Sequence, residues 1–359
     1  NTVKKYRVPI LLMAMIIAVS GCSRSEMVDN ETGAENTAAA AAETDDSGGG
    51  AADRKDETDM TDETVTGASL PSELAEIPRG YYEESEYPGT LVELKYDTYE
   101  SMNYEEQDQI LHKRAIVYLP YGYSEDEPYN VFYLMHGGWS DETTYLGTPD
   151  SPNMFKNVLD NGIADGRILP MIVVCPTYNN TSSEDSGDYS LALRLTENYH
   201  NELVNDLIPA VEGTYSTYAE RTDLEGIAAS RDHRAFCGFS MGSVATWRTF
   251  QHCLDYFRYF MPSSGSLTSD GEYMASLVND SGHAWNDFFI FAASGTEDFA
   301  YSSFKNQIEA MSDSGGGTFR YANNEREGNL YFLEQEGGTH SGEYAMEYFY
   351  NGLCWIWQM

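Results

Sequence analysis

The chain has 359 residues, and 41% of them are apolar, which is enough material for the core of one large domain or two small ones. Its formal net charge is -37 at pH 7, and acidic residues outnumber basic residues well beyond the N-terminal segment. This charge excludes nucleic acid and other polyanions as partners, because binding them relies on Lys and Arg side chains that neutralise phosphates. We therefore expect a neutral or weakly charged substrate.

Residues 1 to 22 are typical of a bacterial export signal. Lys4, Lys5 and Arg7 precede an uncharged apolar stretch that is too short for a comfortable membrane span, and small residues follow it. Cys22 directly follows a glycine, an arrangement that resembles a lipoprotein signal, in which this cysteine is lipidated. The expectation is an exported bacterial lipoprotein, attached to the cell surface or a membrane face only through that lipid; an ordinary signal peptide is the alternative.

Residues 23 to 70 are rich in Ala, Gly, Thr, Asp and Glu and have almost no aromatic or branched apolar side chains. Such a composition cannot bury enough apolar surface to offset its ordering entropy, so it predicts a disordered, self-repelling tether. Its expected role is to hold the folded part away from a membrane surface. A charged segment that binds a partner is the alternative.

Residues 71 to 359 have the pattern of one α/β domain. Alternating stretches at 91–99 and 113–120 predict two half-buried antiparallel strands. Nearly continuous apolar runs that end in Gly, Pro or small residues are typical of parallel strands covered on both faces. These predicted interior strands lie at 130–138, 169–176, 233–240 and 286–295.

Helical patterns lie between these strands. In the stretch 196–215 an apolar residue recurs every four positions, which predicts a helix with one apolar face. The aromatic-rich stretch 342–359 predicts a closing helix that packs onto the sheet. Strands that alternate with helices predict an α/β fold, a three-layer sandwich with a mostly parallel central sheet and helices on both faces.

The stretch FCGFSMGSVATW at 236–247 carries the main candidate for chemistry. Gly238 and Gly242 flank Ser240 at the point where a predicted central strand gives way to a predicted helix. A Gly-x-Ser-x-Gly turn in this context holds the serine side chain exposed above the sheet, with the first amides of the helix aimed at it. Ser240 is therefore the predicted nucleophile.

A serine nucleophile needs a base, and the base needs an orienting acid. In this arrangement the base follows the nucleophile along the chain, so the candidates are His252, His283 and His340. His252 falls on the helix after the nucleophile and His283 at the wrong end of the sheet, whereas His340 follows a strand end in a Gly-rich loop. The acid is expected in the loop after the last interior strand, as Asp298 in preference to Glu297.

Two backbone amides are expected to stabilise the oxyanion. One is the amide of Met241, directly after the nucleophile, and the other is that of Gly138 or Trp139, in a Gly-rich loop. His136 in that loop is expected to be structural. No CxxC pair or Cys/His cluster is present, so no metal site is expected. Buried free thiols are preferred to a disulfide for Cys175, Cys237, Cys253 and Cys354.

Several segments together resemble a known family. They are YLPYGY, YLMHGGWSDE, RAFCGFSMGSVATW, SGTEDFAY and GGTHSGEYAMEYFY, and they are similar in order and spacing to the feruloyl and acetyl-xylan esterases of carbohydrate esterase family one, which includes esterase D-like enzymes. The resemblance covers about residues 88 to 359. It implies an α/β-hydrolase fold and serine esterase chemistry without a metal or cofactor, with the triad on Ser240, Asp298 and His340.

The implied substrate is an ester-decorated plant polysaccharide or oligosaccharide. Feruloyl esters of arabinoxylan are the first choice and acetylated xylan is the second, with a siderophore ester or a small thioester as a third possibility. Trp139 is a candidate for stacking on an aromatic acyl group or a sugar face, and the loop at 178–190 is a candidate border of the site. The alternative from a different functional class is a surface-anchored glycan-binding protein that keeps the fold but has lost catalysis.

Overall fold

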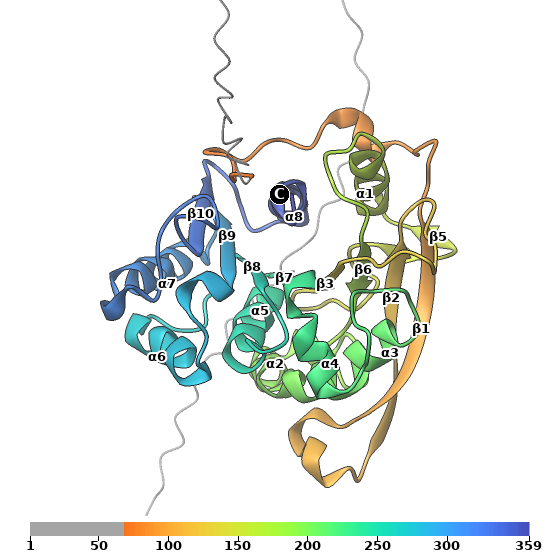
Figure 1. The fold of residues 1–359 in the computed structure, drawn as a ribbon, viewed down its shortest axis with the longest axis horizontal. Coiled ribbons are helices and arrows are strands. Elements are labelled where there is room, and N and C mark those ends of the chain that lie inside the picture. The colour runs from red at the N-terminus through yellow and green to blue at the C-terminus, as the bar shows by residue number, and fades with distance from the viewer. Residues whose placement is uncertain (1–67, 359) are drawn as a thin grey trace, which may run out of the picture. The chain divides into compact units, whose positions relative to one another are not determined.

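The computed structural model describes residues 68 to 358, and the central feature of this part is an eight-stranded sheet (Figure 1). The strands are β1 (Thr90–Tyr99), β2 (Ile110–Leu119), β3 (Val131–Met135), β6 (Ile172–Cys175), β7 (Arg234–Phe239), β8 (Tyr259–Ser263), β9 (Phe289–Gly295) and β10 (Leu330–Gln335). They follow the spatial order β1-β2-β6-β3-β7-β8-β9-β10. A separate two-stranded ribbon consists of β4 (Gly147–Thr148) and β5 (Ser151–Pro152).

The strand directions agree with the predicted class. β2 is antiparallel to both of its neighbours, β1 and β6, and the other neighbouring strands are parallel. The predicted mostly parallel sheet with helices on both faces is therefore confirmed. The sequence pattern did not predict β8, because this short run contains Pro262 and proline is unusual inside a central strand.

The central strands send alternate side chains into two separate cores. In β3, Val131, Tyr133 and Met135 belong to one core, whereas Phe132 and Leu134 belong to the other. Both faces of the strand are therefore buried. This explains why β3 is a continuous apolar run in the sequence instead of an alternating one.

Helices cover both faces of the sheet (Figure 1). One core receives side chains from α1 (Met154–Ala164) and α8 (Gly342–Trp355), and α8 is the predicted closing helix. The other core receives side chains from α2 (Tyr189–Glu202), α3 (Ile208–Glu212), α4 (Leu224–Ala229), α5 (Met241–His252), α6 (Gly271–Ser281) and α7 (Tyr301–Asp313). The predicted helix at 196–215 corresponds to α2, a π-helical turn at Leu203–Leu207 and α3.

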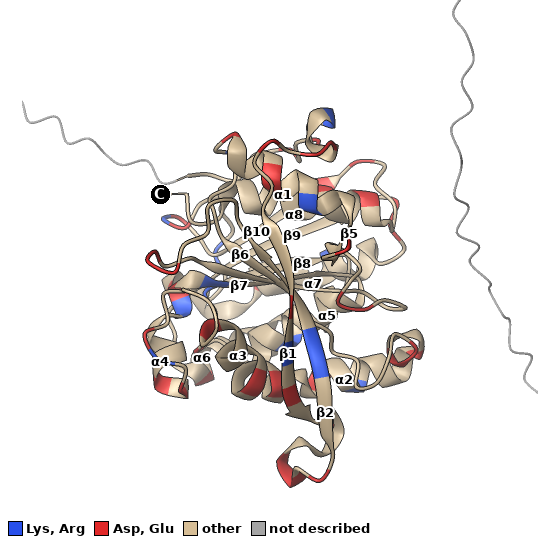
Figure 2. Cartoon of the chain, turned by 90° about the vertical axis from the view of Figure 1, so that its right-hand side faces the viewer, with Lys and Arg blue, Asp and Glu red and all other residues tan. Residues whose placement is uncertain are grey.

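Acidic side chains are widespread on the described part of the chain. Figure 2 shows Asp and Glu on helices and loops around the edge of the sheet that carries β1 and β2. Blue segments, which mark Lys and Arg, lie on these two strands themselves. The basic residues of β1 and β2 therefore have acidic surroundings.

The predicted signal at 1–22, its lipidation site Cys22 and most of the predicted tether lie outside the described residues. Leu70, the last residue of the predicted tether, is 1% exposed, and its amide donates to the carbonyl oxygen of Asn323 at 2.7 Å. The apolar Leu70 side chain packs into one of the two cores, so this residue belongs to the folded part. Between residues 68 and 358, no helix combines the length and the apolar character needed to cross a bilayer.

Candidate active site

Ser240 occupies the turn between β7 and α5, at the carboxyl end of the parallel strands. Its backbone has φ 60° and ψ -119°, a conformation that residues with a Cβ atom rarely adopt. Such a strained turn between a strand and a helix holds the serine side chain above the edge of the sheet, next to the first amides of the helix. The structure therefore contains the turn that the Gly-x-Ser-x-Gly pattern predicts.

Gly238 and Gly242 are required by close approaches of the backbone. A Cβ atom at Gly238 would overlap the backbone of Gly242, and one at Gly242 would overlap the carbonyl oxygen of Met135. Any side chain at these two positions would push β7, α5 and the end of β3 apart. The glycines of the motif thus bring the nucleophile close to the loop that follows β3.

His340 lies between Ser240 and Asp298 and is hydrogen-bonded to both. Its Nε2 atom is 2.9 Å from Ser240 Oγ, and its Nδ1 atom is 2.8 Å from each carboxylate oxygen of Asp298. A carboxylate can only accept, so Nδ1–H donates to Asp298 and Nε2 is left to accept from the serine hydroxyl. The three residues selected from the sequence therefore lie within hydrogen-bonding distance in the order needed for proton transfer.

The loops after β9 and β10 hold this acid and this base together. The Asp298 carboxylate is buried and also accepts the amide of Ala300 at 2.7 Å. The amide of Glu297 donates to the carbonyl oxygen of Gly338 at 2.9 Å, which ties the two loops to each other. The orientation of His340 is thus determined by backbone contacts as well as by its own hydrogen bonds.

The other residues weighed for these roles lie elsewhere. Glu297 is exposed, and the carboxylate that is hydrogen-bonded to the imidazole is that of Asp298. His252 stacks on His200, with ring centroids 4.0 Å apart. His283 is hydrogen-bonded to Asp255 at 2.9 Å.

Two aromatic rings flank the His340 imidazole, and the sequence analysis selected neither. The ring centroids of Phe239 and Phe299 lie 4.4 Å and 4.2 Å from that of His340. Phe239 is buried, whereas 75% of Phe299 is exposed. In the sequence, Phe239 directly precedes Ser240 and Phe299 directly follows Asp298. This adjacency is the one sequence signal that could have indicated the two rings. Both contacts restrict the orientation of the imidazole.

Two backbone amides near the nucleophile are available to an oxyanion. Among residues 68 to 358, the amides of Gly138 and Met241 have no hydrogen-bond acceptor. The amide of Trp139, by contrast, donates to the carbonyl oxygen of Ser186 at 3.1 Å. Of the two donors predicted in this loop, the structure therefore supports Gly138 and not Trp139, because the N–H of Trp139 is already used.

His136 holds the loop that carries Gly138. The Nδ1–H of its buried ring donates to the carbonyl oxygen of Gly137 at 2.7 Å. Its Nε2 atom accepts a hydrogen bond from the Thr177 hydroxyl at 2.7 Å, and the ring stacks on that of Tyr178. Burial lowers the pKa of His136 to about 4, so the imidazole is neutral at pH 7. His136 is therefore a structural residue of the loop, as predicted.

Residues 68 to 358 contain neither a side-chain cluster suited to a metal ion nor a disulfide. Within residues 68 to 358, no group of three or more His, Cys, Asp or Glu side chains is arranged to hold a metal ion. The cysteines of this part are unpaired: Cys175, Cys237, Cys253 and Cys354.

The arrangement can perform acyl transfer. His340 can take the proton of Ser240 as the hydroxyl attacks a carbonyl carbon, and Asp298 can stabilise the imidazolium that forms. The amides of Gly138 and Met241 can donate to the developing oxyanion. These are the groups that hydrolysis of an ester through a covalent intermediate requires.

The chain is similar to parts of two longer curated proteins. The family model described as "Putative esterase" matches residues 112 to 298, just over half of the chain. Endo-1,4-beta-xylanase Y of Acetivibrio thermocellus is 41% identical over 247 residues, which cover 67% of this chain and 21% of that protein. An endo-1,4-beta-xylanase/feruloyl esterase of Xylanibacter ruminicola is 32% identical over 171 residues, which cover 46% of this chain and 20% of that protein. The chain thus spans about a fifth of the length of these relatives.

Solved structures match most of the described part. One is a serine-to-alanine mutant of the feruloyl esterase module from Clostridium thermocellum complexed with sinapinate. It is 37% identical in sequence, and the match has a TM-score of 0.69 and covers 80% of this chain and 95% of that chain. Another is a CE1 ferulic acid esterase from Anaeromyces mucronatus, 20% identical, with a TM-score of 0.55 over 77% of this chain and 94% of that chain. At this lower identity the likeness concerns the fold alone.

Proposed function

The chain belongs to the esterase family with the α/β-hydrolase fold, and from this premise we propose that it is a serine esterase that releases feruloyl groups from plant cell-wall polysaccharide. The observation that carries the proposal is the hydrogen-bonded chain of Ser240, His340 and Asp298 beside two free amides. A nucleophile, a base and an orienting acid in contact are what acyl transfer requires. The choice of acyl group comes from the similarity to a feruloyl esterase module.

In the first step, Ser240 Oγ attacks the ester carbonyl carbon while His340 Nε2 takes the hydroxyl proton. Asp298 accepts Nδ1–H and stabilises the imidazolium, and the amides of Gly138 and Met241 donate to the carbonyl oxygen as it becomes negative. The tetrahedral intermediate then breaks the bond to the sugar oxygen, which takes the proton from His340. The product of this step is a feruloyl ester on Ser240.

In the second step, water takes the place of the sugar hydroxyl. His340 removes a proton from the water as its oxygen attacks the acyl carbon, and the same two amides stabilise the second tetrahedral intermediate. When that intermediate collapses, His340 returns the proton to Ser240 Oγ and ferulate leaves. The net reaction converts one ester and one water into a carboxylic acid and a free sugar hydroxyl.

A glycan-binding protein that keeps the fold without catalysis is the alternative from another class. A chain that has lost catalysis is expected to have lost at least one of the nucleophile, base, acid or amide positions. Here all of these positions are occupied, and the nucleophile, the base and the acid lie within hydrogen-bonding distance of one another. This observation favours the enzyme.

A product screen with matched esters tests the proposal. The full chain is expected to release ferulate from methyl ferulate and from feruloylated arabinoxylan, measured by chromatography, whereas a Ser240→Ala variant should release it about a millionfold more slowly. Release of acetate from acetylated xylan without release of ferulate would replace the feruloyl assignment by an acetyl one. Inactivity on both would direct attention to siderophore esters and small thioesters.

Trp139 is proposed to contact the aromatic acyl group. Trp139 is 77% exposed, and its ring lies against the backbone of Gly187. A Cβ atom added to Gly187 would be only 3.1 Å from this ring. A Trp139→Ala variant is expected to raise KM for methyl ferulate about three- to tenfold, because an aromatic pair contributes about 0.5–1.5 kcal/mol. The acetyl ester of the same alcohol lacks the ring, so its KM should hardly change.

The control for this variant is Tyr121→Ala, which removes another exposed ring, one that follows the end of β2 away from the site. Steady-state kinetics on both esters should be unchanged in the control. An equal rise in KM for the feruloyl and the acetyl ester in Trp139→Ala would contradict a contact with the acyl ring.

A further inference from the structure

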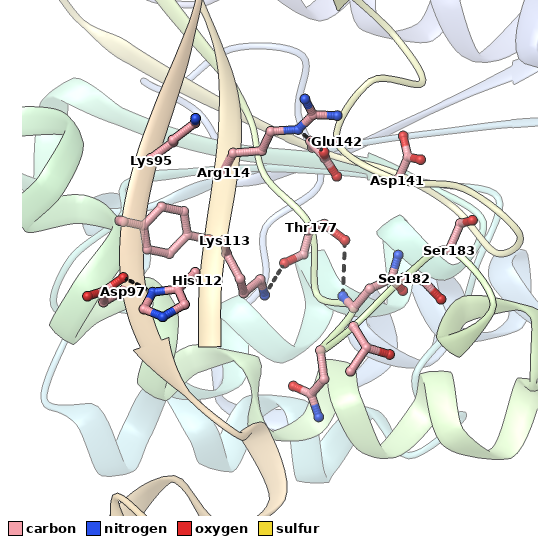
Figure 3. Close-up of a pocket in the computed structure, with 14 residues that line it drawn as sticks. Lys95, Asp97, His112, Lys113, Arg114, Asp141, Glu142, Thr177, Ser182 and Ser183 are labelled. Atoms are coloured by element: carbon pink, nitrogen blue, oxygen red, sulfur yellow. Dashed lines mark hydrogen bonds and ion pairs between the residues drawn. The ribbon is translucent and has the colours of Figure 1, made fainter. Parts of the chain in front are cut away.

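A polar groove of about 960 Å³ lies between the β1–β2 hairpin and two loops of the described part of the chain (Figure 3). The β1–β2 hairpin forms one wall, and the loops that follow β3 and β6 form the other. The mechanism proposed above uses no residue of this groove. The lining residues that matter to its chemistry are Lys95, Asp97, Arg114, Asp141, Asn179 and Ser183.

The groove presents both hydrogen-bond donors and acceptors. Lys95 lies directly opposite Arg114 in the β1–β2 register, a placement of like charges that is unfavourable unless each has a partner. Arg114 is paired with Glu93 and with Glu142, each at 2.6 Å. The exposed Lys95 has no carboxylate partner among the described residues, so its ammonium group is available to a ligand.

Asn179 gives a second, independent indication of a ligand. The residue is 3% exposed, and its side-chain amide donates to the carbonyl oxygen of Ser140 at 2.9 Å. Its Oδ1 atom is buried and has no donor within residues 68 to 358. A buried acceptor without a donor costs free energy, and a small shift of the Asn179 side chain toward the groove would let a ligand hydroxyl supply the missing hydrogen bond.

The floor of the groove is held in place by a buried ion pair. Lys113 Nζ is 2.7 Å from a carboxylate oxygen of Glu202. It also donates to the carbonyl oxygen of Thr177 at 2.7 Å (Figure 3). Both charged side chains are almost fully buried. Because these contacts are made within the protein, they fix the position of Lys113 and of the backbone at Thr177.

The loop after β3 links the groove to the site, because Asp141 and Glu142 of this loop line the groove and Gly138 of the same loop is the oxyanion donor. Ser140, which Asn179 holds, is two residues from the oxyanion donor Gly138, a separation of at most about 7 Å along an extended chain. The same loop is tied to the loop at 178–190, because the amide of Ser140 donates to the Ser186 hydroxyl at 3.1 Å. The groove therefore lies only a short stretch of loop away from the oxyanion donor Gly138.

We propose that this groove binds the sugar residues that carry the ester, as a neutral oligosaccharide segment of the polysaccharide. Sugar hydroxyls both donate and accept, which matches a wall that offers an ammonium group, carboxylates, an amide and hydroxyls. An aromatic acyl group would gain little from such polar walls, and a polyanion would meet the carboxylates of Asp97, Asp141 and Glu142. The inference rests on the proposed function, since it concerns the alcohol part of the same ester.

Two esters with the same acyl group test the groove. For a feruloylated arabinoxylo-oligosaccharide, Lys95→Ala is expected to raise KM at least about tenfold with kcat unchanged, the effect of losing one hydrogen bond from a charged donor. For methyl ferulate, which has no sugar, kcat/KM should stay within about twofold of the wild type. The control Arg221→Ala removes an exposed cation outside the groove and should alter neither ester.

A binding measurement makes the inference independent of catalysis. Calorimetric titration of the Ser240→Ala chain with unesterified arabinoxylo-oligosaccharide should show binding, and adding Lys95→Ala should raise Kd by a similar factor. An unchanged Kd, or an equal loss of kcat/KM on both esters, would overturn the groove as a sugar site. If the wild-type chain hydrolyses neither ester, the proposed function fails, and the titration alone decides whether the groove binds sugar.

Discussion

A Ser240→Ala variant is expected to hydrolyse feruloyl esters with a kcat about a millionfold below that of the wild type. The hydroxyl lies 2.9 Å from His340 Nε2, and without it no acyl-enzyme can form. A residual rate above that in water is expected, because the amides of Gly138 and Met241 still stabilise negative charge on the carbonyl oxygen. The measurement is kcat for methyl ferulate at saturating substrate, with product quantified over hours for the variant.

Labelling with a fluorophosphonate probe checks the same prediction at the covalent step. The wild-type chain should be labelled and Ser240→Ala should not be. The matched control is Ser276→Ala in α6, whose hydroxyl donates to the carbonyl oxygen of Tyr273 and takes no part in the site. Equal labelling of wild type and Ser240→Ala, or no labelling of the wild type, would refute the assignment of Ser240 as nucleophile.

A His340→Ala variant is expected to lose about as much kcat as Ser240→Ala, since the hydroxyl is a weak nucleophile without its base. Because the two residues act as a unit, the double variant should be hardly slower than either single variant. If the two losses multiply instead, the residues act independently and the proposed proton transfer is wrong. The measurement is again kcat for methyl ferulate, in all three variants.

The control for the second prediction is His200→Ala. His200 lies on α2, where it stacks on His252 and takes no part in the hydrogen bonds of the site. Its replacement should leave kcat within a few-fold of the wild type, whereas thermal unfolding of all variants would show that each is folded. A large loss in His200→Ala would mean that helix stability, and not the base, controls the rate.

The core of the site could be predicted because its signals are local. The Gly-x-Ser-x-Gly turn depends on a strand before and a helix after, and both are visible as an apolar run and an amphipathic stretch around Ser240. His340 and Asp298 each follow a strand end in the order that this fold uses. The carboxyl ends of parallel strands meet at one edge of the sheet, so strand order alone brought these residues near each other.

Other features could not be predicted, since they depend on contacts between distant segments. Whether Gly138 or Trp139 has a free amide was decided by Ser186, which belongs to a loop that follows a different strand. The exposed ring of Phe299 packs on His340, although 41 positions separate the two residues along the chain. No local sequence pattern indicates such a pair. The strand β8 escaped prediction because Pro262 gave a local signal against it, which the neighbouring strands override.

The sequence by itself determined the fold class, the nucleophile turn and the order of base and acid, because apolar periodicity and glycine positions act over a few residues. Only the tertiary structure decided which amide is free for the oxyanion and which rings orient His340. It also decided that Lys95 and Asn179 line one groove together with Asp141, which follows Gly138 in the same loop. These properties are set by which loops meet at the edge of the sheet, and hydrogen-bond partners from separate loops become neighbours only when the chain is folded.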